Sequence, residues 1–410
     1  MMNRSGMRRV GAVCTLAMLI GLAACGPGSA SDASVTLTVW TSQEEQSSQD
    51  AWLQTMERAF EEEHPEYDIT WNNAVVSSAD APTMMRQDPS AGADVYVYAS
   101  DQLGTLLDAG AIGQMSRDAV EQIREQNDDV SIQTVTAEDG EIYGVPLSGN
   151  TWFMYYDASV YTEEDVRSFD ALLAKGVVSF PMTNSWYLPA FYMGNGNTIF
   201  GEDGTDVSAG VDFSGEKASE VTEYLVGLRN NPNFVNDADG AGLAGIQNGT
   251  VDVLFSGSWD SVNVKEALGE NFGVAQLPSY NLNGKQVQMR AFAGSTAVAW
   301  NPYSDQPIAA CQFAAFLGTA ESQLSRYESI GFIPTDTSLA ADSEVADDPV
   351  AVAQLDTVNN TSVAQPSLAE MNDFWKPCEN FGKAIINGDV TAANAAEKTE
   401  AWNSAYDSLK

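Results

Sequence analysis

The sequence predicts an α/β protein of two domains, each built on a largely parallel β-sheet flanked by helices. Its 410 residues are too many for one ordinary hydrophobic core. Hydrophobic residues make up 44% of the chain and aromatic residues 10%, as in globular rather than disordered proteins. Short apolar runs typical of strands alternate with segments of helical periodicity, and this alternation favours parallel sheets.

The pattern begins with a strand and an amphipathic helix. Val35–Trp40 alternates in polarity and is rich in Val and Thr, which predicts a strand. In Ser47–Glu63, large apolar side chains recur every four residues from Trp52, and Pro65 marks the end of this helix. Two more strands are expected at Ile69–Val76 and Ala93–Tyr98, followed by a short helix from Gln102 to Asp108.

The same alternation continues toward the C-terminus. Short apolar runs predict strands at Val177–Phe180, Val251–Phe255, Phe272–Leu277 and Ala291–Trp300. Helices are expected at Glu216–Leu228, at Pro307–Ser329, and in two segments that begin at about Ser367 and Val390. The Asn-Asn-Pro sequence at residues 230–232 ends the first of these helices.

The N-terminus has the pattern of an export signal. Three arginines within the first nine residues precede a mostly apolar stretch that is too short to span a bilayer comfortably. The sequence LAAC at residues 22–25 and the small residues after it resemble the lipobox of bacterial lipoproteins, in which the cysteine is lipidated. Residues 1–24 are therefore expected to be a signal peptide, residues 25–35 a linker, and Cys25 a lipid anchor on the outer side of the cell membrane. Ordinary secretory cleavage is the alternative.

Two cysteines remain after this processing, because Cys14 lies in the signal peptide and Cys25 carries the lipid. Cys311 and Cys378 would then face an oxidising compartment, where a disulfide between them is possible and two free thiols are the alternative.

The charge of the chain argues against two classes of partner. The formal net charge is −38, and loss of the three arginines in the signal peptide would make it more negative still. Nucleic acids and anionic lipid surfaces are therefore unfavourable partners. The acidic surface also has a simpler explanation, which is that it keeps an exported protein soluble.

Residues that suit catalysis or metal binding are mostly missing. The only histidine, His64, lies at an acidic helix end, so neither a Ser-His-Asp triad nor a His/Cys zinc site can be assembled. The phosphate-binding pattern GxxxxGK[ST] does not occur, and the acidic segments at 201–206 and 236–240 lack EF-hand spacing. No cofactor or metal is expected. Carboxylate pairs suitable for glycoside hydrolysis cannot be distinguished among 57 acidic residues, so a surface glycosidase stays as an alternative.

Polar and aromatic side chains instead collect after several predicted strands, where open α/β sheets bind ligands. The candidates are Glu44, Glu45, Tyr98, Ser100, Asp101, Asn150, Trp152, Asn184, Trp186, Tyr187, Trp259 and Trp375. A sugar ring has an apolar face that suits aromatic rings and a hydroxylated edge that suits amides and carboxylates. For any one tryptophan, a place in the core is an equally good interpretation. Trp152, in the apolar run NTWFMYYD, is expected to be core, whereas Trp259 stands among turn-forming and polar residues.

Several segments carry a resemblance to a known family. They are LTVWT (37–41), GADVYVYASDQLGTLLDAGAI (92–112), GEIYGVPLSGNTWFMYYD (140–157), NGTVDVLFSGSWD (248–260), GFIPT (331–335) and DFWKPCENFGKAIINGDVTAANA (373–395). Their order and spacing, from about Thr36 to the C-terminus, resemble the extracellular solute-binding lipoproteins of bacterial ABC sugar importers, of the maltose/maltodextrin-binding type.

The resemblance implies a hinged periplasmic-binding-protein-like fold, in which two α/β lobes close on a ligand. The chain would cross between the lobes near Pro146–Trp152, Gln288–Ser295 and Ser343–Ala351. The N-terminal lobe would then contain residues 36–148 and 295–345, and the C-terminal lobe residues 149–294 and 346–410.

The resemblance also implies roles for single residues. Asp101 stands at a carboxylate that binds sugar hydroxyls, and Glu44 matches an acidic residue of the first loop. Aromatic contacts fall at Tyr98, Trp186, Trp259 and Trp375, and Asn150 and Asn184 replace glutamates. Gln102 and Glu45 replace an arginine and a lysine, which leaves the identity of the sugar open.

Together these features predict a non-enzymatic, monomeric binder of maltose or malto-oligosaccharides that delivers its ligand to the membrane permease of an ABC importer. Another oligosaccharide or a non-sugar solute is the alternative ligand.

Overall fold

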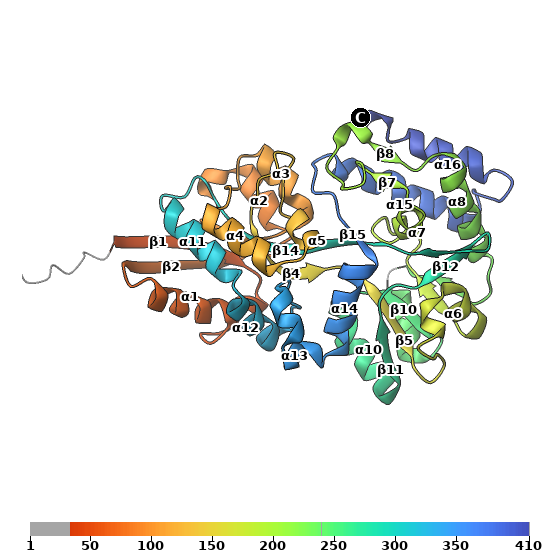
Figure 1. Ribbon diagram of the computed structural model, residues 1–410, viewed down its shortest axis with the longest axis horizontal. Helices are drawn as coiled ribbons and strands as arrows, with labels where there is room; N and C mark the ends of the chain where they lie inside the picture. The colour runs from red at the N-terminus through yellow and green to blue at the C-terminus, as the bar shows by residue number, and fades with distance from the viewer. Residues whose placement is uncertain (1–32, 239, 410) are drawn as a thin grey trace, which may run out of the picture.

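The computed structural model describes residues 33–238 and 240–409. The expected signal peptide and Cys25 lie outside the described residues. Two main β-sheets lie along the long axis of the molecule, one toward each end, and helices cover both of them (Figure 1). Within the two described ranges, none of the helices has the length and apolar composition needed to cross a bilayer.

The first sheet has six strands in the order β15-β14-β3-β1-β2, with β4 also paired to β14. They are β1 (Ala33–Thr41), β2 (Tyr67–Val75), β3 (Val95–Ala99), β4 (Val145–Asn150), β14 (Ala291–Trp300) and β15 (Ser362–Ala364). β1 pairs in parallel with β2 and β3, whereas β14 runs antiparallel to β3 and β4. The helices on this side are α1 (Trp52–Glu63), α2 (Ala81–Gln87), α3 (Leu103–Asp108), α4 (Arg117–Gln126), α5 (Asp129–Gln133), α11 (Pro307–Leu317) and α12 (Ala320–Ile330).

The second sheet has five strands in the order β11-β5-β10-β6-β9. They are β5 (Phe153–Asp157), β6 (Val178–Phe180), β9 (Phe234–Asn236), β10 (Val253–Ser256) and β11 (Phe272–Ala275). Two small antiparallel pairs join β7 (Thr198–Ile199) to β8 (Val211–Asp212) and β12 (Ser279–Leu282) to β13 (Lys285–Gln288). The helices on this side are α6 (Phe169–Lys175), α7 (Pro189–Gly194), α8 (Gly215–Arg229), α9 (Ala241–Asn248), α10 (Ser261–Leu268), α15 (Met371–Asn387) and α16 (Ala395–Ser404). Two further helices, α13 (Ser343–Ala346) and α14 (Pro349–Asn360), lie between the two sides (Figure 1).

The α/β class is confirmed, but both sheets are mixed rather than largely parallel. The antiparallel pairs are β14 with β3 and β4 in the first sheet, and β5 with β10 and β11 in the second. β4 ends at Asn150 and β5 begins at Phe153, so the chain passes from one sheet into the other without a crossover helix. In the second sheet, β5 runs antiparallel to both of its neighbours, β10 and β11.

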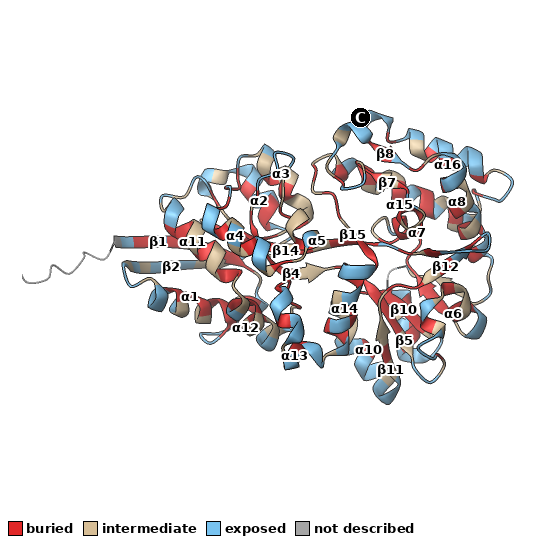
Figure 2. Cartoon of the chain, viewed as in Figure 1, coloured by how far each residue is buried: buried red, intermediate tan, exposed pale blue. Residues whose placement is uncertain are grey.

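Buried apolar residues form a separate core around each sheet. Figure 2 marks the buried residues of the chain in red. The N-terminal core combines residues 35–147 with 297–317, and the C-terminal core combines residues 152–292 with 368–409. A third, smaller cluster packs Ile333, Val345 and Val350 with Phe153 and Leu254 of the second sheet. We call the two large units the N-terminal and C-terminal lobes; their residue boundaries stay a prediction.

Of the two alternatives for the remaining cysteines, the structure has free thiols at Cys311 and Cys378 and no disulfide between them. Cys378 is buried in the C-terminal core, whereas Cys311 packs against the N-terminal core. Burial raises the pKa of both thiols, so they stay protonated and unreactive at neutral pH.

The single helix expected at Pro307–Ser329 is two helices, α11 and α12. A Cβ atom on Gly318 would lie 2.1 Å from a methyl carbon of Val145, so this position must stay small where α11 ends against β4. Thr319 then begins α12, because its hydroxyl accepts a hydrogen bond from the backbone N–H of Ser322 at 3.4 Å.

Candidate functional site

A cavity of about 330 Å³ lies between the two lobes. It is lined by Ser100, Asp101, Asn150, Ser185, Trp186, Gly294, Gln365 and Trp375. These residues come from the end of β3, from the connecting strands β4 and β14, from the loop after β6, from the segment after β15 and from α15. Residues far apart in the sequence therefore converge on one cleft, and Asp101, Asn150, Trp186 and Trp375 are members of the predicted site.

Asp101 is the only charged residue in this lining. It lies on a single 3₁₀ turn (Ser100–Gln102) that follows β3 directly, where an α/β sheet presents its ligand-binding edge. Burial raises the pKa of the Asp101 carboxyl, and a hydrogen bond from the Gln102 side-chain amide to Oδ2, at 3.0 Å, opposes part of that rise. The site therefore offers one partly desolvated carboxylate, which is a strong acceptor for hydroxyl donors.

The connecting strands form the floor of the cleft. Asn150 of β4 pairs with Gly294 of β14, and both residues line the cavity. Ser100 is fixed to the same floor, because its hydroxyl accepts a hydrogen bond from the backbone N–H of Ser295 at 2.9 Å. A Cβ on Gly294 would approach the Ser100 hydroxyl to 3.3 Å, so the glycine keeps this floor open.

Trp186 is held in the cleft by a local turn and by a distant amide. The Asn184 side-chain oxygen accepts a hydrogen bond from the Trp186 backbone N–H at 2.9 Å, which is an Asx turn. The indole N–H of Trp186 donates to Oε1 of Gln365 at 2.8 Å. Asn184 itself is exposed and does not line the cavity, so the structure gives it a role in the turn.

Trp259 flanks the cavity without lining it. It follows β10, its side chain is 51% exposed, and its ring lies 6.0 Å from that of Trp186, centroid to centroid. A Cβ on Gly257 would lie 2.0 Å from the Trp259 ring, so only a glycine lets this indole lie over its own turn. A hydrogen bond from β5 also holds this turn, since the Tyr155 hydroxyl donates to the Gly257 carbonyl at 2.9 Å.

Trp375 is the third ring at the cleft. It lies on α15 and packs edge-on against Phe292 and Phe374, with centroid distances of 5.9 and 5.4 Å. The side chain is half-buried, so these two phenylalanines support one side of the indole while another part of it borders the cavity.

The structure contradicts the assignment of Tyr98 as a ligand contact. Its side chain is fully buried in the N-terminal core, and its hydroxyl donates to the Tyr143 carbonyl at 2.7 Å. Gly144 leaves room for this tyrosine, because a Cβ there would lie 2.7 Å from the hydroxyl oxygen. Trp152 is also fully buried, as expected for a core residue.

The first loop has two acidic residues with different surroundings. Glu44 is exposed on a 3₁₀ turn and does not line the cavity. Glu45 is buried and forms an ion pair of 2.7 Å with Arg326, which also donates to the Ser148 hydroxyl at 2.8 Å. Glu45 therefore faces the interior of the protein and not the cleft.

Three lining residues are absent from the candidates that the sequence indicates: Ser185, Gly294 and Gln365. Ser100 is a candidate only as a strand-end residue, and Gly294 is a glycine within a strand, which is a signal of close approach. Ser185 and Gln365 had no signal of their own, because their places depend on turns and on partners distant in the chain.

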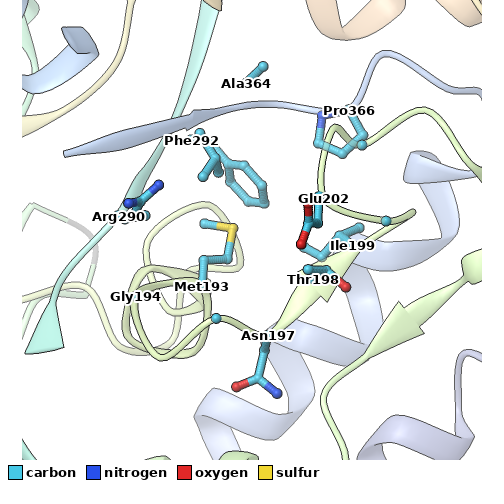
Figure 3. A pocket seen from close by; sticks show the side chains of 14 residues that line it. Met193, Gly194, Asn197, Thr198, Ile199, Glu202, Arg290, Phe292, Ala364 and Pro366 are labelled. Carbon is cyan, nitrogen blue, oxygen red and sulfur yellow. The ribbon is translucent and has the colours of Figure 1, made fainter. Parts of the chain in front are cut away.

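A larger cavity of about 410 Å³ contains none of the predicted site residues (Figure 3). Met193, Arg290, Phe292 and Glu202 are among its lining residues. The smaller cavity is the candidate site, because it brings together four of the predicted residues, Asp101, Asn150, Trp186 and Trp375.

The geometry disfavours hydrolysis and metal binding at the cleft. Glycoside hydrolysis uses two carboxyl groups, whereas Asp101 is the one carboxyl among the lining residues. In the described part of the chain, no group of three or more His, Cys, Asp or Glu residues is placed to hold a metal ion.

Two α/β lobes joined by connecting strands, with an aromatic and amide-lined cleft between them, define a two-lobed solute-binding protein. The chain belongs to the family of bacterial extracellular solute-binding proteins, whose model matches residues 55–353. This is a family of binding proteins and not of enzymes, so the glycosidase alternative is set aside.

Known relatives and structures agree with this assignment. The chain is 24% identical over 413 residues to a galactooligosaccharide-binding protein of Bacillus subtilis, with 93% of each chain covered. It is 26% identical over 323 residues to a maltooligosaccharide ABC transporter solute-binding lipoprotein of Streptococcus pneumoniae, with 74% of each covered.

Among solved structures, one described as "with acarbose" is 45% identical, with a TM-score of 0.82 over 92% of this chain and 100% of that one. Maltodextrin-binding protein MalE1 of L. casei BL23, solved without ligand, is 28% identical, with a TM-score of 0.85 over 92% and 99%. These similarities confirm the maltose-binding type of fold.

Proposed function

We propose that this protein captures malto-oligosaccharides between its lobes and delivers them to the permease of an ABC importer. The observation that carries the proposal is the cleft itself, where Trp186 and Trp375 border a cavity that also contains Asp101 and Asn150. Support also comes from the relatives, whose names include maltooligosaccharide and maltodextrin binding, and from the acarbose-containing structure.

The two kinds of side chain would divide the recognition of a sugar. Half-buried indoles take the apolar C–H face of a pyranose, and removal of one such ring costs about 1–3 kcal/mol by analogy with bases stacked on aromatics. Asp101 accepts hydrogen bonds from hydroxyls at the sugar edge, and a hydrogen bond to a charged group contributes about 1.5–3 kcal/mol. Asn150 supplies an amide that can donate and accept.

Titration calorimetry with a sugar panel tests this proposal. The panel contains maltose, maltotriose, maltotetraose, acarbose, a galacto-oligosaccharide and cellobiose, and the matched variant is Asp101→Asn. We expect saturable binding of the α-glucans, weakened in the variant, and recovery of the intact sugar after long incubation. Binding of the galacto-oligosaccharide alone would support the alternative ligand that one relative's name suggests. Failure to bind any sugar would contradict the proposal.

The lipid anchor belongs to the same proposal. It is motivated by the LAAC sequence ending at Cys25 and by the lipoprotein named among the relatives. We expect Cys25→Ser to abolish acylation, so that the precursor stays uncleaved or the protein is released from the membrane. Mass spectrometry of the mature N-terminus measures this, and acyl chains on the variant protein would contradict the anchor assignment.

A further inference from the structure

The segment between β15 and α15 touches both halves of the cleft. Resting on the function proposed above, we propose that Gln365 is a positioning residue that fixes the indole of Trp186 for ligand binding. We call residues 365–369 the bridging segment, because its contacts reach Trp186 in one lobe and the helix after Asp101 in the other.

The side-chain contact is the first observation. Oε1 of Gln365 accepts the indole N–H of Trp186 at 2.8 Å, Gln365 is only 9% exposed, and both residues line the cavity. An indole has a single N–H, so rotation of the ring away from this acceptor would leave a partly buried donor unsatisfied. The hydrogen bond therefore selects one ring orientation.

The ring neighbours of Trp186 do not select that orientation as strictly. Tyr187 meets the indole edge-on at 5.6 Å and Trp259 lies tilted beside it at 6.0 Å, centroid to centroid. Aromatic contacts at these distances tolerate several ring angles, whereas a hydrogen bond of 2.8 Å depends steeply on direction. Gln365 is thus the directional constraint on the Trp186 indole.

The backbone of the bridging segment is the second observation. The N–H of Gln365 donates to the Ala293 carbonyl of β14 at 2.8 Å, and the Ser367 carbonyl accepts from the Gly104 N–H of α3 at 2.8 Å. A Cβ on Gly104 would lie 2.6 Å from the Ala369 nitrogen, so α3 approaches the segment as closely as a glycine allows.

These hydrogen bonds connect the two sides of the site, the one with Asp101 and the one with Trp186, to the bridging segment. Asp101 lies on the turn that runs directly into α3, and α3 is bonded to the bridging segment. Trp186 is bonded to Gln365, the first residue of that segment. Both sides of the site are therefore connected to the bridging segment, Asp101 through α3 and Trp186 through Gln365.

A double-mutant cycle tests the proposal. Gln365→Met keeps the length of the side chain and removes the acceptor, and Trp186→Phe removes the indole N–H while keeping a ring. We expect Gln365→Met to weaken maltotriose binding about three- to tenfold in the wild-type background. In the Trp186→Phe background it should weaken binding less than twofold, because the bond is already gone.

A ligand-free measurement separates this proposal from the proposed function. In ¹⁵N–¹H NMR spectra, the Trp186 indole N–H, assigned by its loss in Trp186→Phe, should be protected from hydrogen exchange. Gln365→Met should speed that exchange at least tenfold, and Gln365→Glu, which keeps an acceptor, should preserve the protection.

Two results would contradict the positioning role of Gln365. The positioning role would be overturned if Gln365→Met weakened maltotriose binding by the same factor in the wild-type and Trp186→Phe backgrounds. It would also be overturned if Gln365→Met left the hydrogen-exchange rate of the Trp186 indole N–H unchanged. If the wild type prefers another sugar of the panel, the cycle is measured with that sugar. If the wild type binds none, the proposed function and its affinity consequence both fail, while the exchange experiment still decides whether Gln365 fixes the ring.

Discussion

Trp152 and Trp259 lie at the same end of two neighbouring strands of the second sheet, but one is buried and the other is exposed. β5 and β10 pair so that Phe153 faces Ser256, which places Trp152 just before one strand and Trp259 just after its neighbour. Trp152 is fully buried, with its ring 4.6 Å from that of Tyr187, whereas Trp259 is 51% exposed. The contrast teaches that residue type alone does not decide whether an aromatic ring is buried or exposed, and at Trp259 the room left by Gly257 lets the ring lie over its own turn.

The largest expected effect is on stability, at the buried Trp152. We expect Trp152→Ala to lower the free energy of unfolding by about 3–5 kcal/mol, because it leaves a large cavity in the C-terminal core. Chemical denaturation of the ligand-free protein measures this loss. Trp152→Phe is the matched control with a much smaller loss, since the Trp152 indole N–H has no hydrogen-bond partner in the described part of the chain. Equal losses from both variants would mean that ring volume is not what this site requires.

Asp101, which lies in the N-terminal lobe, is expected to affect ligand binding rather than folding, in contrast to Trp152. Asp101→Ala should weaken sugar binding by about 1.5–3 kcal/mol, which is roughly tenfold to a hundredfold. Because its pKa is raised, the carboxyl takes up a proton at a higher pH than an ordinary aspartate, so affinity should fall as the medium is acidified. Calorimetry across a pH series checks both effects, and an affinity that is the same in the variant would remove Asp101 from the site.

The exposed tryptophan should give the reverse ranking of Trp152. We expect Trp259→Ala to cost about 1–3 kcal/mol of sugar affinity, by analogy with bases stacked on aromatics, with little change in the ligand-free melting temperature. Trp259→Phe, which keeps a ring, is the control and should retain most of the affinity. A large drop in melting temperature with near-native affinity would return Trp259 to the structural residues.

A buried carboxyl far from the cleft should affect stability alone and by a smaller amount. Burial, partly offset by a hydrogen bond from Asn73, raises the pKa of Glu57 to about 7. The folded state therefore holds a proton on Glu57 that the unfolded state releases at lower pH. The contribution of Glu57 to stability is fully present below about pH 4.5 and is lost as the pH rises through 7. We expect this group to contribute on the order of 1–2 kcal/mol to that decline.

Thermal melts of Glu57→Gln from pH 5 to 8 measure the Glu57 effect. The variant should lose this component of the pH dependence while its sugar affinity stays that of the wild type. An unchanged slope would show that Glu57 keeps an ordinary pKa.

Much of the fold could be predicted because its signals are local. Val35–Trp40 is recognisable from its Val and Thr residues and Ala291–Trp300 from its apolar run, and the structure places β1 and β14 there. The short connecting strands β4 and β5 were expected only as a crossing near Pro146–Trp152, since Pro146 and Gly149 weaken a strand pattern. The sheets were expected to be more parallel than they are, because direction depends on which strands connect the lobes.

The site was predictable in proportion to how local its geometry is. Asp101 and Trp186 follow strand ends and do line the cavity. Tyr98 was misplaced, because its burial depends on space left by Gly144. The inward direction of Glu45 depends on Arg326, 281 residues away. Such long-range pairings leave no periodic signal in the chain.

The discontinuous N-terminal core has a consequence for how the chain folds. Residues 35–147 form that core together with residues 297–317, so about 150 intervening residues must emerge before it can be completed. Contacts of such long sequence separation form slowly, because the loop must close before the packing rewards it. A chain that emerges N-terminus first therefore cannot complete its N-terminal core until residues 297–317 have appeared.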